Sequence, residues 1–319
     1  MDLVARGLLC DNWEAVSQVP RSFFIFGLIS SFMPMQTEHE VFNITVPDLG
    51  EIPVTEKPCL LCGGRDFFPL NSFVLNNKRF HTVRCVRDGM MWLEPQPTEA
   101  FYRKLYGEVY HTTGPDDPLL EQATLDVHSK TEELARVAEL RLDQIEQFTG
   151  KGALLEVGFG SGAMLEAAGR RGWRVVGLEL DQGCVDRMRA AGITAHNCSL
   201  LEYKAEPKKF DVLAMYSVIE HTLNPAAYLE KAFQLLKVGG ILVLRLPDTE
   251  ADGPPASLIA HVYHFNAHTI MVLLRRCGFE VLQIDNFHMW KPSRYPGSLW
   301  NMNVVSQKGK AVAPLRSAS

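Results

Sequence analysis

An apolar run that ends in a glycine-rich loop at the start of a helix constrains this chain more than any other feature. Residues 153–157 read Ala-Leu-Leu-Glu-Val, and Gly158-Phe-Gly160-Ser-Gly162 follows at once, before the helical pattern of residues 163–171. Glycines at such a junction let the backbone turn sharply and let the amide groups of the helix start approach a ligand closely. The sequence therefore predicts a buried strand, a ligand-binding loop and a helix here.

Short apolar runs alternate with helical patterns from residue 151 onward. Further strands are expected at 174–179, 210–216, 241–246, 279–284 and around 299–306. Residues 236–240 form the expected turn before the strand at 241–246. This alternation is typical of an α/β fold with a mainly parallel sheet.

The glycine loop alone does not identify its ligand. Gly158-x-Gly160-x-x-Ala163 also satisfies the dinucleotide-binding pattern, so a nicotinamide or flavin enzyme is one interpretation. Glu179 ends the second strand, where a carboxylate binds ribose hydroxyls in either case. Glu156 helps to distinguish a dinucleotide from a cationic ligand. Its charge would repel a pyrophosphate and attract an amino group or a sulfonium. We therefore expect a cationic cofactor; the alternative is that Glu156 only hydrogen-bonds the loop backbone.

A cysteine cluster precedes this half of the chain. Cys59 and Cys62 form one C-x-x-C pair, and Cys85 begins a second pair whose last position is Asp88. Two complete pairs would predict a tetrahedral zinc site, and aspartate can also ligate zinc. Two interpretations stay open: a structural zinc held by these four residues, or a ribbon-like β module without metal. In the second case the module would be held by apolar side chains, namely Phe67, Phe68, Phe73, Val83 and Trp92.

Composition limits the remaining possibilities. A net charge of -5 over 319 residues, without a long basic run, argues against a nucleic-acid partner. The apolar run at residues 23–35 is shorter than the roughly 20 residues needed to cross a bilayer, so we expect no stable membrane insertion. Seven cysteines, an odd number and mostly scattered, favour a reducing compartment, and we predict a cytoplasmic location.

The chain divides into five expected segments. They are a poorly ordered leader (1–55), a degenerate zinc-ribbon-like module (56–97), a helical linker (98–150), an α/β domain (151–307) and a tail (308–319). Met33 and Met35 lie directly before a polar stretch, which leaves open that the leader reflects a start codon placed too early.

The α/β half resembles the class I S-adenosylmethionine-dependent methyltransferases over about residues 150–307. Residues 156–162 are similar to the first motif of that family, Glu179 to its ribose-binding acid and residues 236–240 to its turn before the fifth strand. Residues 261–266 resemble a block of the small-molecule branch that contains ubiquinone-type O-methyltransferases. Some of those relatives also carry an amino-terminal zinc module.

The resemblance implies a Rossmann-like seven-stranded sheet, mostly parallel with one antiparallel strand, and S-adenosyl-L-methionine as the cofactor. Ser199 and Leu200 are the candidates to replace an aspartate that many members place against the adenine. The implied cofactor-binding residues are Glu156, Gly158, Gly160, Gly162, Glu179, Leu180, Ser199, Leu200 and Tyr216.

Methyl transfer to a hydroxyl or amine requires that the acceptor lose a proton, and a neutral imidazole is the natural base near pH 7. His221 follows the fourth strand, at the sheet edge where ligands bind, and His264 lies in a segment expected to form a wall of the acceptor site. The alternatives are a loop-ordering hydrogen bond between His221 and Glu220, and simple packing of His264 beside aromatic neighbours.

These residues favour a methyltransferase acting on a small organic acceptor. The preferred acceptor atom is the hydroxyl oxygen of a quinone-like, sugar or secondary-metabolite compound. Two other interpretations remain: a nucleotide-dependent oxidoreductase or sugar-modifying enzyme on a Rossmann-like fold, and a cofactor-binding scaffold without catalysis. The sequence predicts neither the acceptor's identity nor the oligomeric state.

Overall fold

The computed structural model describes residues 42–44, 51–106, 131–249, 259–288 and 300–309, all within one compact unit that begins at His39. Most of the expected leader and nearly all of the expected tail lie outside the described residues. Among the described residues, no helix combines the length and the apolar character that crossing a lipid bilayer requires.

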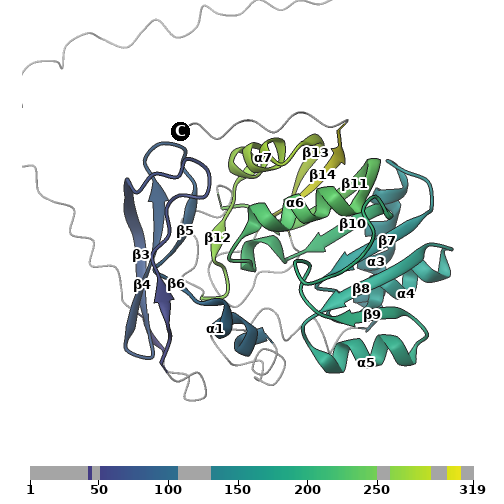
Figure 1. Ribbon diagram of the computed structural model, residues 1–319, viewed down its shortest axis with the longest axis horizontal. Coiled ribbons are helices and arrows are strands. Elements are labelled where there is room, and N and C mark those ends of the chain that lie inside the picture. The colour runs from purple at the N-terminus through teal and green to yellow at the C-terminus, as the bar shows by residue number, and fades with distance from the viewer. Residues whose placement is uncertain (1–41, 45–50, 107–130, 250–258, 289–299, 310–319) are drawn as a thin grey trace, which may run out of the picture. The chain divides into compact units, whose positions relative to one another are not determined.

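A seven-stranded sheet organises the larger part of the unit, in the order β13-β14-β11-β10-β7-β8-β9 (Figure 1). β14 pairs antiparallel with both of its neighbours, and the other pairs are parallel. This confirms the expected sheet with one antiparallel strand. The strands are β7 (Ala153–Val157), β8 (Arg174–Glu179), β9 (Thr194–Asn197), β10 (Phe210–Tyr216), β11 (Leu236–Pro247), β13 (Phe279–His288) and β14 (Trp300–Lys308).

Alternate residues of the central strands point to opposite faces and enter two separate hydrophobic cores. Leu154, Val212 and Val243 belong to the core shared with α3 (Thr131–Glu146), α4 (Ala163–Arg170) and α5 (Gln182–Ala190). The other core includes Leu155 and Leu213, with α6 (Pro225–Leu235) and α7 (Ala267–Arg276). The sheet is thus covered on both faces, which explains its near-continuous apolar strands.

The expected turn at residues 236–240 is wrong in detail. β11 already begins at Leu236, which pairs with Phe210, and the register then shifts so that Ile241 pairs with Val212. Gly239 has a φ of 78°, a conformation that only glycine adopts readily. The glycines therefore form a bulge inside a strand rather than a turn before it.

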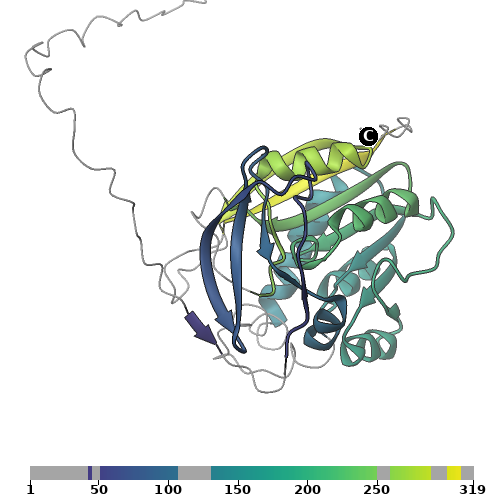
Figure 2. The ribbon, with the colours of Figure 1, turned by 60° about the vertical axis from the view of Figure 1, so that its left-hand side comes forward.

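A second sheet has the order β1-β3-β4-β5-β12, and its two longest strands, β3 and β4, form a hairpin (Figure 2). Of the five apolar side chains expected to hold it, Phe73, Val83 and Trp92 are buried, whereas Phe67 and Phe68 are exposed at the surface. Its strands are β1 (Phe42–Ile44), β3 (Phe67–Leu75), β4 (Lys78–Cys85), β5 (Met91–Glu94) and β12 (Tyr263–His264). β2 (Val54–Thr55) pairs separately with β6 (Gln96–Pro97).

The second sheet contains a strand from the α/β half. Tyr263 and His264 of β12 pair antiparallel with Trp92 and Met91 of β5. Sequence order gave no sign of this pairing, because about 170 residues separate the two strands. β1 and β2 lie within the range expected as leader, and the five-segment division of the chain stays a prediction.

Helix α3 belongs to the α/β half by its contacts, although the sequence placed it in a linker. Arg171, at the end of α4, donates from Nε to Glu139 at 2.8 Å and from Nη2 to Asp143 at 2.7 Å. It also donates to Glu146 at 3.2 Å. With only 22% of its side chain exposed, Arg171 anchors α3 against the sheet's helical layer. Helix α1 (Glu99–Lys104) follows β6 in the chain.

Candidate active site

The glycine loop has the backbone that its sequence predicts. Gly158, Gly160 and Gly162 have φ values of 68°, 50° and 78°, all in the left-handed region. A Cβ atom at Gly158 would lie 2.7 Å from Cγ2 of Val218. The glycine loop therefore touches the segment that follows β10, and the carboxyl ends of β7 and β10 lie side by side, because the two strands are paired.

Backbone amides hold the carboxylate of Glu179. Its Oε2 accepts from Gly160 N at 3.0 Å, and its Oε1 accepts from Leu180 N at 2.7 Å and Asp181 N at 3.3 Å. Asn197 at the end of β9 donates to the Leu180 carbonyl at 2.7 Å. Since a carboxylate has about four acceptor positions, Glu179 is fixed in place with capacity left for ribose hydroxyls.

Glu156 is a buried carboxyl group with an unused oxygen. It is 3% exposed at the end of β7, and its Oε2 has no hydrogen-bond partner among the described residues. Burial raises the pKa of Glu156 to about 8, with Glu179 adding to the rise and Arg141 opposing it. A buried polar atom without a partner is costly, so this site fits a ligand that brings a cationic donor.

Tyr216 and Arg141 adjoin this carboxyl group. Tyr216 ends β10, and its buried hydroxyl has no partner among the described residues. The guanidinium carbon of Arg141 lies 3.9 Å from the centre of the Tyr216 ring. Burial raises the pKa of Tyr216, and the charge of Arg141 opposes this rise as it does at Glu156.

Arg141 is a functional candidate that the sequence analysis missed. It lies on α3, three residues after Ala138 and four before Ile145, both of which are buried. Residues with this spacing share one face of a helix, so Arg141 places a charge on the apolar face. That break in the apolar pattern was the available signal.

Ser199 and Leu200 were predicted to contact the adenine, and their positions in the structure do not distinguish this role from a purely structural one. The amide and the hydroxyl of Ser199 both donate to Oε2 of Glu202, at 3.0 Å and 2.9 Å. Leu200 is fully buried. Neither contact identifies an adenine-binding group, and their role stays a prediction.

His221 lies on the 3-10 helix Ile219–His221 directly after β10. Its Nδ1 is 2.8 Å from the Ala260 carbonyl and 3.0 Å from the Tyr106 hydroxyl. Because a carbonyl can only accept, Nδ1 carries the hydrogen and Nε2 keeps its lone pair. Burial lowers the pKa of His221 to about 4, and the hydrogen bond to Ala260 opposes this shift. The imidazole is therefore neutral at physiological pH and can accept a proton at Nε2.

The alternative role of His221, a loop-ordering hydrogen bond with Glu220, is not found among the hydrogen bonds of the described residues. Nε2 of His221 lies 3.8 Å from Oε1 of Glu220, which exceeds hydrogen-bond distance. Glu220 is 2% exposed, and both of its carboxyl oxygens lack hydrogen-bond partners within the described part of the chain. Burial raises its pKa to about 8, and the nearby backbone amides of Glu220 and Val218, together with the charge of Arg245, oppose the rise.

Two more histidines extend this group. The ring centres of His221 and His261 are 4.8 Å apart, and those of His261 and His264 are 6.1 Å apart. His264 is 5% exposed, and its Nε2 is buried without a partner in the described ranges. The structure thus brings the two predicted histidines together through His261, for which no role was predicted from the sequence.

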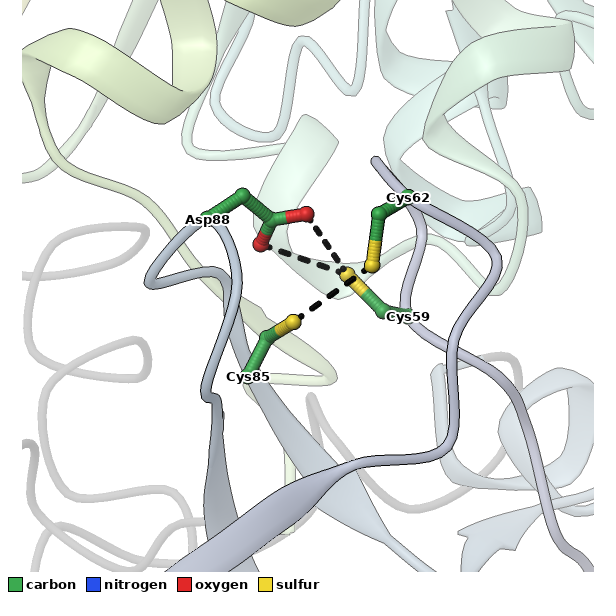
Figure 3. A group of neighbouring side chains, drawn as sticks. All are labelled: Cys59, Cys62, Cys85 and Asp88. Atoms are coloured by element: carbon green, nitrogen blue, oxygen red, sulfur yellow. Dashed lines mark hydrogen bonds between the residues drawn. The ribbon is translucent and has the colours of Figure 1, made fainter.

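The four predicted metal ligands also converge, at a separate place in the second sheet's module. One potential ligand atom from each of Cys59, Cys62, Cys85 and Asp88 lies within 4.8 Å of the others (Figure 3). His81, a further donor near this cluster in the sequence, is hydrogen-bonded instead to Ser72 at 2.8 Å.

The strand order, the glycine loop and the acid that ends β8 define a class I methyltransferase fold. Residues 128–284 match a family model described as a methyltransferase domain. These residues are a domain of the S-adenosylmethionine-dependent methyltransferase family, which confirms the resemblance seen in the sequence and makes S-adenosylmethionine the family's cofactor.

Similar proteins come from several bacteria. A probable S-adenosylmethionine-dependent methyltransferase of Mycolicibacterium smegmatis is 28% identical over 133 residues, 40% of this chain and 52% of that protein. A ubiquinone biosynthesis O-methyltransferase of Psychrobacter cryohalolentis is 30% identical over 167 residues, 48% of this chain and 63% of that protein. The chain spans less than two thirds of the length of either relative.

Among solved structures, the Burkholderia thailandensis 1,6-didemethyltoxoflavin-N1-methyltransferase with bound 1,6-didemethyltoxoflavin and S-adenosylhomocysteine is 16% identical to this chain. The TM-score is 0.45, and the match covers 57% of this chain and 79% of that one.

Proposed function

We propose that this protein transfers a methyl group from S-adenosylmethionine to a hydroxyl oxygen of a small organic acceptor. The observation that carries the proposal is the state of His221. Its Nδ1 is fixed by the Ala260 carbonyl, and its Nε2 is left as a neutral proton acceptor. His221 lies on the segment after β10, which touches the glycine loop.

The cofactor half of the site would be held by residues around the glycine loop. Glu156 supplies a buried carboxyl oxygen for a cationic group, and Glu179 supplies fixed acceptors for ribose hydroxyls. Arg141 is half-buried next to both Glu156 and Tyr216, where its charge suits a carboxylate. When bound, S-adenosylmethionine supplies an electrophilic methyl group.

Proton removal falls to His221. The acceptor oxygen would bond to the methyl carbon as the carbon–sulfur bond of S-adenosylmethionine breaks, and Nε2 of His221 would take the hydroxyl proton. The products would be a methyl ether, S-adenosylhomocysteine and an imidazolium that returns its proton to solvent. An enzyme of this kind acts mainly by holding the two reactants in line in a dry site, so few catalytic side chains are needed.

The rings around His221 favour a flat aromatic acceptor among the candidate hydroxyl compounds. Tyr106 and His261 contact the His221 ring edge-on, with centre-to-centre distances of 5.8 Å and 4.8 Å. A quinone-like phenol could pack against such rings, whereas a sugar would present polar groups to them. The ubiquinone O-methyltransferase relative supports the same acceptor class.

A cytoplasmic location and the absence of a nucleic-acid partner belong to this proposal. None of the six cysteines in the described ranges is in a disulfide, in keeping with a reducing compartment. A small-molecule acceptor does not require a basic surface, which agrees with the net charge of -5.

Calorimetry with S-adenosylmethionine, S-adenosylhomocysteine and NADH tests the cofactor, and transfer of a labelled methyl group to catechol, sugar and amine panels tests the acceptor. Glu156→Gln should weaken binding by about 10- to 100-fold, because a charged hydrogen bond to the cofactor's cationic group is lost. Glu166→Gln, which replaces an exposed acid on α4, should leave binding unchanged. Binding of NADH instead would support the alternative of a nucleotide-dependent oxidoreductase. Cofactor binding without transfer to any acceptor would support the alternative of a non-catalytic scaffold.

A further inference from the structure

Two turns of the second sheet's module repeat one backbone hydrogen-bond pattern. We call residues 59–64 the first knuckle and residues 85–90 the second knuckle. In each, the first residue's amide donates to the sixth residue's carbonyl, at 2.9 Å and 2.8 Å. The fifth residue's amide donates to the first residue's carbonyl, at 2.9 Å and 3.2 Å. The fifth residue is Gly63 or Gly89, with φ values of 71° and 74°.

The equivalence extends to the fourth position, where one knuckle has Cys62 and the other has Asp88. The Gly64 amide donates to Sγ of Cys62 at 3.4 Å, and the Met90 amide donates to Oδ1 of Asp88 at 3.0 Å. Backbone amides that point at a ligand atom stabilise its negative charge and fix its direction. Asp88 therefore occupies the place of a fourth cysteine in both sequence and hydrogen bonding.

The four side chains point toward one another (Figure 3). Sγ of Cys59 lies 3.4 Å from both carboxylate oxygens of Asp88, and Sγ of Cys62 lies 3.5 Å from Sγ of Cys85. Zinc–sulfur bonds of about 2.3 Å in a tetrahedron would place sulfur atoms about 3.8 Å apart. The observed spacing thus needs only small side-chain shifts to surround a zinc ion.

We propose that Cys59, Cys62, Cys85 and Asp88 bind one structural Zn²⁺, which holds the two knuckles together and thereby supports the strand that carries His264. Three thiolates and one carboxylate have the same total charge as four thiolates. The carboxylate is the harder ligand, so the site should hold zinc less tightly than a four-cysteine site would.

The connection to the active site runs through short contacts. β5 follows the second knuckle directly and pairs with β12, and the Leu93 amide donates to the Val262 carbonyl at 2.9 Å. The Val262 amide donates in turn to the Glu220 carbonyl at 2.9 Å. From the other knuckle, the Leu61 carbonyl accepts from the Arg276 guanidinium on α7. Residues 259–264 are therefore held between the knuckle module and the His221 segment.

Metal content of the purified full chain, grown with zinc and measured by plasma mass spectrometry, tests the ligand set. We expect about one zinc per wild-type chain and less than about a tenth of that in Cys62→Ser and Asp88→Ala. Of the three cysteines in the site, Cys62 is exposed, so its replacement spares the buried side chains. Asp66→Ala, an exposed acid of the same module, should keep full content. Asp88→Cys should retain zinc against a chelator that strips the wild type.

Cobalt binding is an independent spectroscopic test of the same ligand set. Co²⁺ added to the metal-stripped wild type should produce the visible absorption of a tetrahedral thiolate site, and Cys62→Ser should not. Wild-type chain that holds no zinc after reconstitution, or Asp88→Ala with undiminished content, would overturn the proposal.

Hydrogen exchange tests the structural consequence without any activity measurement. Removal of the metal should speed exchange in residues 259–264 severalfold and leave residues 182–190 of α5 unchanged. Unchanged exchange at 259–264 would overturn the supporting role. The effect on turnover rests on the proposed function: chelation should lower methyl transfer while cofactor binding persists. Failure of the methyltransferase proposal would appear differently, as a zinc-loaded chain that binds no S-adenosylmethionine.

Discussion

The two sides of the candidate site are built in different ways. Most of the cofactor side comes from one continuous stretch, from β7 through the glycine loop to Leu180, to which β10 adds Tyr216 and α3 adds Arg141. Backbone amides satisfy the key acid of this stretch, Glu179. The acceptor side brings together Tyr106, His221 and His261, which lie far apart in the sequence. A site built from neighbouring residues can be predicted from the sequence, whereas a site built from distant side chains can be recognised only once the fold is known.

Both sides contain buried polar groups that lack a partner among the described residues, but the chemical groups differ. On the acceptor side, both carboxyl oxygens of Glu220 and Nε2 of His264 are buried without partners among the described residues. On the cofactor side, Oε2 of Glu156 and the Tyr216 hydroxyl have that status. Such groups are costly in a folded chain, and each set marks where a ligand with complementary groups would be stabilised.

The largest expected effect tests the acceptor side. His221→Gln should lower turnover by about 100- to 10,000-fold, because it removes the proton acceptor. Binding of S-adenosylhomocysteine, measured by calorimetry, should stay within about twofold, because His221 belongs to the other side of the site. His268→Gln, an exposed histidine on α7, is the matched control. Unchanged turnover in His221→Gln would remove this residue from catalysis.

The next effect tests the cofactor side. Gly158→Ala should weaken S-adenosylhomocysteine binding by about 10- to 100-fold, since the new Cβ would meet Val218 and the backbone is left-handed. Gly192→Ala, with a φ of 78° and no atom within 4 Å of the added Cβ, controls for backbone strain alone. Equal losses in both variants, measured by calorimetry, would mean that the close approach is unimportant.

A smaller effect tests whether α3 belongs to the cofactor side. Arg141→Gln should weaken binding about tenfold at pH 7, because one charged hydrogen bond is lost. Loss of this charge should also raise the pKa of Glu156 further, since Arg141 now lowers it. Binding should therefore recover partly as the pH rises. Arg136→Gln, exposed on the same helix, should bind normally, and a normal Kd for Arg141→Gln would exclude this role.

The smallest effect concerns pH. Burial lowers the pKa of His221 from 6.5 to about 4, so the base is already neutral well below pH 6. Turnover at saturating cofactor should change by less than about twofold between pH 5.5 and 7, and should fall only as the pH approaches 4. A rate that rises tenfold per pH unit up to about pH 6.5 would mean an unshifted base.

Sequence reasoning succeeded where local chemistry decides structure. The glycine loop and the acid of Glu179 were read from adjacent residues, and the parallel sheet followed from alternating apolar runs. Arg141 was missed because the helical pattern was read only for its apolar members. The β5–β12 pairing was missed because strand pairing across about 170 residues leaves no local pattern. The bulge at Gly239 was read as a turn because both require the same glycine conformation.

The shared second sheet has a consequence for how this chain can change over generations. Because β12 comes from the methyltransferase half and pairs with β5, neither half supplies all the strands of that sheet. A gene fusion or recombination event that exchanged the cysteine module at residue 98 would leave Tyr263 and His264 facing an unmatched strand. The module and the methyltransferase half should therefore be inherited as one unit, with paired substitutions at the β5–β12 contact rather than free shuffling.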